Sequence, residues 1–504
     1  MAKSAPGARG RASSRTRAAI ARRCAPPQCA GPGPAATLAH VPELIDRWLG
    51  AQLATVPDYH EFPGVDATAA AFAEIAAAHP RVARLARVGT SRLGEPIESL
   101  VVGDGARHAI VFAFPHPNEP IGGLTATHLA RQLCADAALC GSFDLTWHVI
   151  GCADPDGARL NEGWFGGPFT RTHYARNFYR PAGDEQIEWT FPFQHKTAYF
   201  DAVLPETAAL VRLIDRLRPA FMCSLHNSEL GGAYYYLSRP LAELYPVLQA
   251  IPTALGVPLH RGEAEGPSIK TLAAGVFAEM RADEIYDYQE SLGQDMSAFR
   301  SGASSSEYAS RYGTVTLIGE LPYWTDAAAD DTSPAPISHA QALRDQADGL
   351  ADFLDVAGAA LAATRADLRV GTPFASPFTR AASYFIDALA DLPAANRRRA
   401  DAPEAQRPAT VAEAASCADV VHSFRLRYGG MLLRALDGEL AVGRGTPAIR
   451  AQHARLAAVF DDWCAAAAAV TPAEPLPIRS LVATQYAALL ATARQVAGRE
   501  AAGR

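Results

Sequence analysis

The sequence predicts an α/β fold with a largely buried sheet, followed by a helical region. Between about residues 41 and 365, short apolar segments alternate with amphipathic ones. Amphipathic segments such as 122–133 and 206–217 repeat apolar residues at the spacing of a helix. The apolar segments have the length of strands and are bounded mostly by Gly, Pro or polar residues: PIESLVVG, AIVFAF, DLTWHVI, AFMCSL, AYYYLS and TVTLIG. Strands that alternate with helices in this way indicate a sheet covered by helices.

The composition is that of a globular protein with a large core. Of the 504 residues, 49% are hydrophobic and 20% are charged, which excludes a fibrous or wholly disordered chain. The 46 basic and 53 acidic residues give a net charge of −7, which argues against a general nucleic-acid or anionic-membrane partner. No uninterrupted apolar stretch reaches the roughly 18 residues of a membrane span.

Three parts are predicted along the chain. Residues 1–42 are basic and rich in Gly, Pro, Ser and Ala, so we expect a disordered tail. Residues 43–365 carry the α/β pattern, and residues 366–504 form a helical region whose pattern suggests no chemistry. The tail lacks the apolar segment of a signal peptide, although another targeting role stays open. The eight cysteines are too sparse for a disulfide scaffold, so reduced thiols and a cytoplasmic location are expected.

Polar side chains follow three of the predicted strands. The pattern His-x-x-Glu occurs four times, but only the copies at His116 and His226 directly follow an apolar strand. A third strand, TVTLIG, runs into Glu320. Because ligands of open α/β sheets bind at the carboxyl ends of strands, we expect these side chains to meet at one edge. Glu119 follows His116 by three residues, at the start of a helical segment, and can face the same point.

These residues predict a zinc site. Two His and one Glu, with a fourth position left to water, are the ligand set of a catalytic zinc ion. We therefore predict one Zn²⁺ held by His116, Glu119 and His226. Glu320 is not needed as a ligand and could take a proton from the water, whose pKa the metal lowers to about 7.

Residues from about 65 to 325 resemble the zinc carboxypeptidases, the M14 metallopeptidases. The similarity rests on six short motifs in that family's order: HPRVARLARVGTSRLGEPIESLVVG (79–103), HPNE (116–119), DPDG (154–157), YARNF (174–178), SLHNS (224–228) and IGELP (318–322). The resemblance implies a three-layer α/β/α fold with a mixed sheet. It also implies a zinc-dependent metallocarboxypeptidase that hydrolyses an amide bond next to a free carboxylate, with a peptide or acyl amino acid as substrate.

The resemblance assigns roles to further residues. Glu320 would be the general base and later the proton donor. Arg176, with Asn177, would bind the substrate carboxylate, which a guanidinium can do through two parallel hydrogen bonds. The family also places an arginine beside the zinc to stabilise the oxyanion. Arg159 and Arg171 both fit that role, and the closeness of Arg159 to the DPDG loop favours it slightly.

The sequence departs from the family pattern at several positions. Ala175 stands where the family has Asn, Asp154 stands where Asn is usual, and Phe299 falls where a Tyr closes over the substrate. Tyr308 or the tyrosines at 234–236 could replace that Tyr. These departures concern the substrate more than the metal. Three serines and an acid fall where the family forms its side-chain pocket, and the acid would favour a basic or polar group: Ser304, Ser305, Ser306 and Glu307.

Two other functions stay open. The related aspartoacylase and succinylglutamate desuccinylase group, which removes acyl groups from amino acids, has an opening similar to HPNEPIGG. The DPDG and ELP motifs favour the peptidase. A catalytically silent binding protein would explain the missing Asn and Tyr, but retention of three metal ligands and Glu320 argues against it. The sequence leaves the natural substrate and the oligomeric state open.

Overall fold

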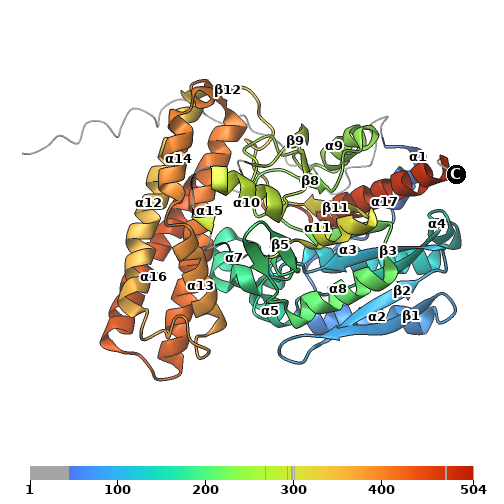
Figure 1. The fold of residues 1–504 in the computed structure, drawn as a ribbon, viewed down its shortest axis with the longest axis horizontal. Coiled ribbons are helices and arrows are strands. Elements are labelled where there is room, and N and C mark those ends of the chain that lie inside the picture. Colours follow the sequence, from blue (N-terminus) through green and yellow to red (C-terminus); the bar gives the residue numbers. More distant parts are fainter. Residues whose placement is uncertain are drawn as a thin grey trace, which may run out of the picture. The chain divides into compact units, whose positions relative to one another are not determined.

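The computed structural model describes residues 45–502, apart from residues 267, 292, 294, 297, 298, 300 and 471–473 (Figure 1). The predicted disordered tail at 1–42 lies outside this range. The described chain belongs to one compact unit. Among the described helices, none is both long and apolar enough to cross a membrane.

A nine-stranded mixed sheet forms the centre of the fold, in the order β1-β2-β4-β3-β7-β11-β8-β10-β9. Its strands are β1 (Ala83–Thr90), β2 (Pro96–Val102), β3 (Arg107–Ala113), β4 (Leu145–Ile150), β7 (Phe221–His226), β8 (Tyr234–Leu237), β9 (Thr271–Ala273), β10 (Val276–Ala278) and β11 (Val315–Glu320). The four central strands β4, β3, β7 and β11 are parallel. On one side of them β2 pairs antiparallel with β4, and β1 pairs antiparallel with β2. On the other side β8 pairs antiparallel with β11. All six apolar segments predicted as strands are strands.

Helices cover both faces of the sheet, which confirms the predicted three-layer α/β/α architecture (Figure 1). Alternate residues of β3 point to opposite faces: Val111 packs in the same cluster as α2 (Val65–Ala78) and α3 (Ile121–Ala135), and Ile110 packs with α8 (Pro205–Leu217). Shorter helices lie in the connections: α1 (Arg47–Leu53), α4 (Ala137–Gly141), α5 (Pro155–Arg159), α6 (Glu162–Phe165), α7 (Arg171–Asn177), α9 (Tyr245–Ala254), α10 (Ala282–Ser291) and α11 (Ser305–Ala309). Two small hairpin sheets pair β5 (Phe193–His195) with β6 (Ala198–Phe200) and β12 (Pro334–Ser338) with β13 (Pro408–Thr410).

The C-terminal part is helical, as predicted. Residues 366–504 contain α13 (Pro377–Ala388), α14 (Leu392–Asp401), α15 (Val411–Ala441), α16 (Pro447–Val470) and α17 (Ile478–Ala502), whereas the long helix α12 (His339–Thr364) precedes the predicted boundary. Helices α12 to α16 stand beside the sheet, whereas α17 packs on α3 (Figure 1). The division predicted at 365/366 stays a prediction. Helix packing continues across it, because α12 contacts α14, α15 and α16.

Asp154 caps the short helix α5 and is buried. One carboxylate oxygen accepts a hydrogen bond from the Gly157 backbone N–H at 2.9 Å, and the other is buried without a hydrogen-bond partner among the described groups. Burial raises the pKa of Asp154 from about 4 to about 7. A carboxyl whose pKa is raised in the folded state stabilises the fold less as pH rises, so this contribution is lost between about pH 4 and pH 7.

We therefore expect Asp154→Asn to stabilise the protein at alkaline pH. Asparagine keeps an oxygen that can accept the Gly157 N–H and removes the buried charge. The free energy of unfolding should rise by about 1–3 kcal/mol at pH 8, because each pKa unit corresponds to about 1.4 kcal/mol. The gain should vanish near pH 4, where the wild-type carboxyl is protonated. Denaturant titrations at pH 8 and pH 4 measure the free energy of unfolding of both proteins. An equal difference between variant and wild type at the two pH values would show that the raised pKa of Asp154 is not the cause.

Candidate metal centre

Three buried side chains meet at the carboxyl edge of the sheet. His226 is the last residue of β7, and His116 follows the adjacent parallel strand β3 by three residues. Glu119 lies two residues before α3. Each of the three offers a ligand atom, and these atoms lie within 4.8 Å of one another. The structure thus brings together the three residues that the sequence predicted as metal ligands.

Two glycines allow α3 to begin close to the strand ends. A Cβ at Gly122 would lie 2.9 Å from the Leu225 side chain on β7, and a Cβ at Gly123 would lie 2.8 Å from the Phe114 ring. Real side chains do not approach so closely, so any other residue would push the helix outward. The sequence PIGG after HPNE therefore sets the position of Glu119 against the histidines.

The donor atoms fit a divalent cation. Glu119 lies between the two imidazoles, with Oε1 3.0 Å from His116 Nδ1 and Oε2 3.1 Å from His226 Nδ1. Glu119 Oε2 and His226 Nδ1 are buried and in ion-pair contact with each other, but neither makes a hydrogen bond to a described group. A buried polar atom without a hydrogen bond is incompletely satisfied, which costs stability. A cation bound by these atoms would remove that cost.

The charge around the histidines also suits a cation. Burial lowers the pKa of His116 to about 4, so its imidazole is neutral and can act as a ligand. His226 faces three carboxylates, since Glu188 and Glu320 each have an oxygen 3.7 Å from its ring nitrogens in addition to Glu119. Although burial opposes it, these carboxylates raise the pKa of His226 to about 10. The centre therefore attracts positive charge.

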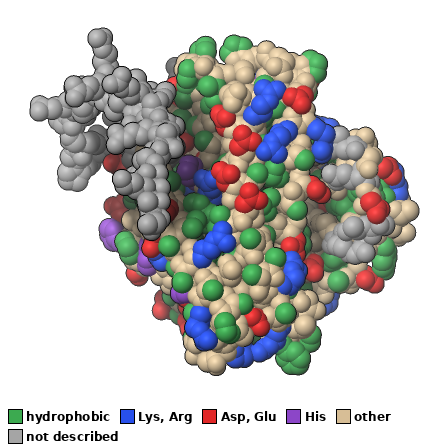
Figure 2. Space-filling view, turned by 90° about the vertical axis from the view of Figure 1, so that its left-hand side faces the viewer, with side chains coloured by type: hydrophobic (Ala, Val, Ile, Leu, Met, Phe, Trp, Pro, Cys, Tyr) green, Lys and Arg blue, Asp and Glu red, His purple; other side chains and the backbone are tan. Residues whose placement is uncertain are grey.

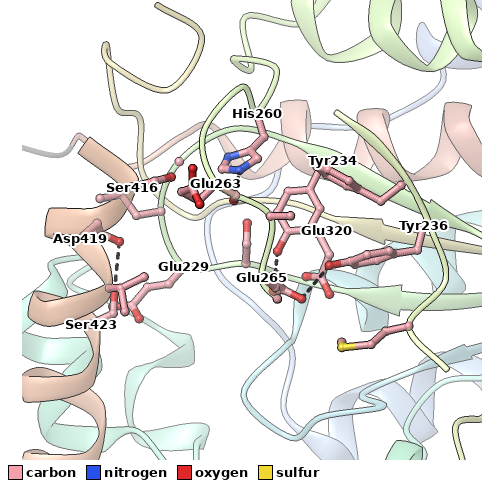
Figure 3. Close-up of a pocket in the computed structure, with 18 of the residues that line it drawn as sticks. Glu229, Tyr234, Tyr236, His260, Glu263, Glu265, Glu320, Ser416, Asp419 and Ser423 are labelled. Atoms are coloured by element: carbon pink, nitrogen blue, oxygen red, sulfur yellow. Dashed lines mark hydrogen bonds between the residues drawn. The ribbon is translucent and has the colours of Figure 1, made fainter. Parts of the chain in front are cut away.

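Glu320 ends β11 beside the metal centre. Strand β11 is parallel to β7, and its register places Glu320 opposite His226. Burial, with Glu119 and Glu265 adding negative charge, raises the pKa of Glu320 well above its usual range. Figure 3 shows Glu320 near Glu265, whose carboxylate accepts hydrogen bonds from the Tyr234 and Tyr236 hydroxyls at 2.7 and 2.8 Å. Those two tyrosines were among the predicted substitutes for the family's Tyr.

The metal centre opens into a cavity of about 860 Å³. One wall comes from β8 and residues 260–266, and the opposite wall comes from α14 and α15. Helix α15 contributes Ser416, Asp419 and Ser423, which Figure 3 shows across the cavity from Tyr234 and Glu320. On the surface of the molecule that Figure 2 shows, acidic and basic side chains are interspersed. The helical region thus takes part in the cavity, although its sequence suggested no chemistry.

The arginines and the asparagine predicted from the family motifs lie elsewhere. Arg159 is bound to Glu95 and Asp66 at 2.7 Å each. Arg171 is buried and donates to Asp419 at 2.9 Å, whereas Arg176 pairs with Asp461 of α16. Asn177 donates to the His173 carbonyl at 2.9 Å. In the described structure none of the four lines the cavity. This placement differs from the predicted roles: α7, which carries Arg171, Arg176 and Asn177, packs against α15 and α16.

Four other arginines line the cavity and were missed: Arg180, Arg398, Arg399 and Arg427. Arg180 has Nη1 3.0 Å from Glu119 Oε1 and Nε 3.0 Å from Gln186 Oε1. Its only sequence signal is its position two residues after YARNF. Arg427 reaches the cavity from α15, with its Nε 3.0 Å from Glu229 Oε2. No signal in the sequence marked Arg427.

The serine-rich segment contributes differently from its prediction. Ser304 lines the cavity, but Ser305 binds Glu188, and Ser306 binds Glu279. Glu307 accepts a hydrogen bond from the Ala282 N–H at 2.8 Å and is not a lining residue. Acidic charge in this part of the cavity comes instead from Glu265 and Glu279. The two aromatics near it also lie off the cavity: Phe299 packs against Phe193 and Tyr286, and Tyr308 bonds Asp215.

Comparison with known proteins identifies the domain. Residues 68–310 match the family model of the zinc carboxypeptidases, Peptidase_M14. This part of the chain is a zinc carboxypeptidase family domain, as its motifs indicated. Members of that family are zinc-dependent, and the match supports a zinc metallopeptidase-like hydrolase. A search of curated proteins found no match.

Solved structures with the same kind of fold are distant in sequence. Carboxypeptidase A from Helicoverpa armigera is 16% identical, with 56% of this chain and 72% of that chain covered and a TM-score of 0.36. A metallo-carboxypeptidase from Burkholderia cenocepacia is 16% identical, with 51% and 60% covered and a TM-score of 0.32. Murein-tripeptide amidase MpaA from Escherichia coli O157 is 18% identical, with 48% and 88% covered and a TM-score of 0.25.

Proposed function

We propose that the protein is a zinc-dependent metallocarboxypeptidase that hydrolyses an amide bond next to a free carboxylate. The observation that carries the proposal is the convergence of three buried ligand side chains with Glu320 at one end of a large cavity. His116, Glu119 and His226 would hold one zinc ion. Glu119 Oε2 and His226 Nδ1, which are buried without a hydrogen bond to a described group, support this assignment.

Zinc supplies a Lewis acid and lowers the pKa of water. The remaining chemistry belongs to side chains of the cavity. Glu320 takes a proton from the attacking water and returns it to the leaving amine, as general base and then general acid. Arg180 lies against Glu119 and places a guanidinium beside the centre, where it stabilises negative charge that develops on the carbonyl oxygen. This assigns to Arg180 the role predicted for Arg159 or Arg171.

The substrate carboxylate is bound by Arg427 in this proposal. Its guanidinium lies 6.0 Å from the Phe178 ring centroid and 5.9 Å from that of Phe424. Glu229 forms an ion pair with the guanidinium, with Oε2 3.0 Å from Nε. A guanidinium that lines the cavity suits a carboxylate, which it binds through two parallel hydrogen bonds. Arg176, by contrast, is paired with Asp461 away from the cavity.

An N-acyl amino acid deacylase of the aspartoacylase type is the second candidate. The wall formed by α14 and α15 favours it, because that wall bounds the space beside the metal centre. A cavity of about 860 Å³ is within the usual range for small ligands. A substrate as small as an acyl amino acid would fit it.

Metal analysis combined with substrate comparison tests the proposal. We expect about one zinc per chain and faster hydrolysis of a blocked dipeptide, such as N-benzoyl-glycyl-phenylalanine, than of N-acetyl amino acids. A chelator should abolish turnover, and zinc should restore it. Faster hydrolysis of the N-acetyl amino acids would favour the deacylase. Bound zinc without hydrolysis of either substrate class would indicate a binding protein.

A further inference from the structure

The second ring nitrogen of His226 faces a buried carboxylate. Nδ1 of His226 points to Glu119, so Nε2 is the nitrogen that carries a proton when the ring is a neutral ligand. That Nε2 is buried and makes no hydrogen bond to a described group. Oε1 of Glu188 lies 3.7 Å from it. A small rotation of the ring or of the carboxylate would close this distance to that of a hydrogen bond.

Glu188 is held in place from its other sides. Its side chain is buried, and its Oε1 accepts hydrogen bonds from the Ser224 hydroxyl at 2.7 Å and the Ser305 hydroxyl at 2.9 Å. Its Oε2 accepts the backbone N–H of Ser305 at 2.8 Å. Three donors to one carboxyl group favour its ionised, acceptor-only form. These hydrogen bonds therefore fix the carboxylate with its Oε1 near His226 Nε2.

The arrangement follows from the topology. Ser224 and His226 are two residues apart on β7, so their side chains lie on the same face of the sheet. Ser305 is the first residue of α11, so its backbone N–H has no partner within the helix and can donate to Glu188. Glu188 thus connects β7 to α11 directly behind the metal centre. It lies outside the motifs on which the family resemblance rests.

We propose that Glu188 is a positioning residue that orients His226 and strengthens its binding of the metal. The inference rests on the metal site of the proposed function, but not on the reaction. Metal-binding histidines generally donate their other N–H to a carboxylate, carbonyl or water. Such a partner fixes the tautomer and raises the basicity of the ring. Loss of the partner typically lowers metal affinity about 10- to 100-fold.

The test compares zinc affinity in Glu188→Gln with that in a matched control, Glu206→Gln. Glu206 is also a buried glutamate, but it accepts the Arg92 backbone N–H at 2.9 Å and lies on α8. Zinc affinity of the full chain is measured by competition with a chromophoric chelator, and thermal unfolding is followed for the zinc-free proteins. We expect the zinc dissociation constant to rise about 10- to 100-fold in Glu188→Gln and to stay at the wild-type value in Glu206→Gln.

A second variant keeps the inference testable if Glu188→Gln fails to fold. Ser305→Ala removes one donor that orients the carboxylate and leaves the carboxylate itself, so its zinc dissociation constant should lie between those of wild type and Glu188→Gln. Wild-type zinc affinity in every folded variant at Glu188 or Ser305 would overturn the inference. An equal loss of affinity in Glu206→Gln would also overturn it, since the effect would then be one of general stability. A wild-type protein that binds zinc but hydrolyses nothing would reject only the proposed reaction.

Discussion

Glu320→Gln should lower kcat about 10³-fold and leave the zinc content unchanged. A carboxamide has nearly the shape of the carboxylate but cannot take a proton from water, and general acid–base catalysis typically contributes about 10²- to 10⁴-fold. Zinc should remain because Glu320 is not among the three residues whose ligand atoms converge. The measurements are kcat for N-benzoyl-glycyl-phenylalanine and zinc per chain after dialysis.

Glu265→Gln is the matched control for this variant. Glu265 is a second carboxylate of the same cavity, but its oxygens are occupied by the Tyr234 and Tyr236 hydroxyls. Its loss should change kcat by less than about tenfold, far below the effect at Glu320. If Glu320→Gln kept its turnover, or if it lost zinc together with activity, Glu320 would not be the general base that we propose.

The metal centre was predictable because its residues lie next to strands that local sequence reveals. His116, His226 and Glu320 each end or closely follow an apolar segment of strand length. Since the corresponding strands β3, β7 and β11 are parallel neighbours, their carboxyl ends meet at one edge. The alternation of strands and helices likewise predicted an α/β fold with a largely buried sheet. Both predictions depend on patterns within a few residues of each feature.

The placement of the arginine side chains could not be predicted in the same way, because it depends on ion pairs with residues far away in the sequence. Arg171 is fixed by Asp419, and Arg176 by Asp461, which are both residues of the C-terminal helices. Nothing near YARNF in the sequence indicates that these helices pack against α7. Arg427 was missed for the related reason that α15 reaches the cavity only through tertiary packing. Short motifs therefore identified the candidate metal ligands but not the arginines that line the cavity.

Replacing Arg427 by Met should lower kcat/KM about 100-fold for a substrate with a free carboxylate. Two charge-assisted hydrogen bonds are lost, each worth about 1.5–3 kcal/mol, and part of that cost is recovered by water in the cavity. For the matching C-terminal amide, which carries no charge at that position, kcat/KM should change by less than about threefold. The measured quantity is the ratio of kcat/KM for N-benzoyl-glycyl-phenylalanine to that for its amide. A merely unfolded variant would lose both activities equally.

Arg176→Met provides the opposing comparison, because the family motif assigns the carboxylate to that residue. Arg176 is half exposed and paired with Asp461 on α16, so its loss should change the same ratio by less than about twofold. Arg427→Lys keeps the positive charge beside Glu229 without the planar fork, and it should fall between wild type and Arg427→Met. If Arg176→Met strongly lowered the ratio of kcat/KM for the acid to that for the amide, and both Arg427 variants left this ratio unchanged, the substrate carboxylate would bind to Arg176, as the motif indicates. Arg427 would then only neutralise Glu229.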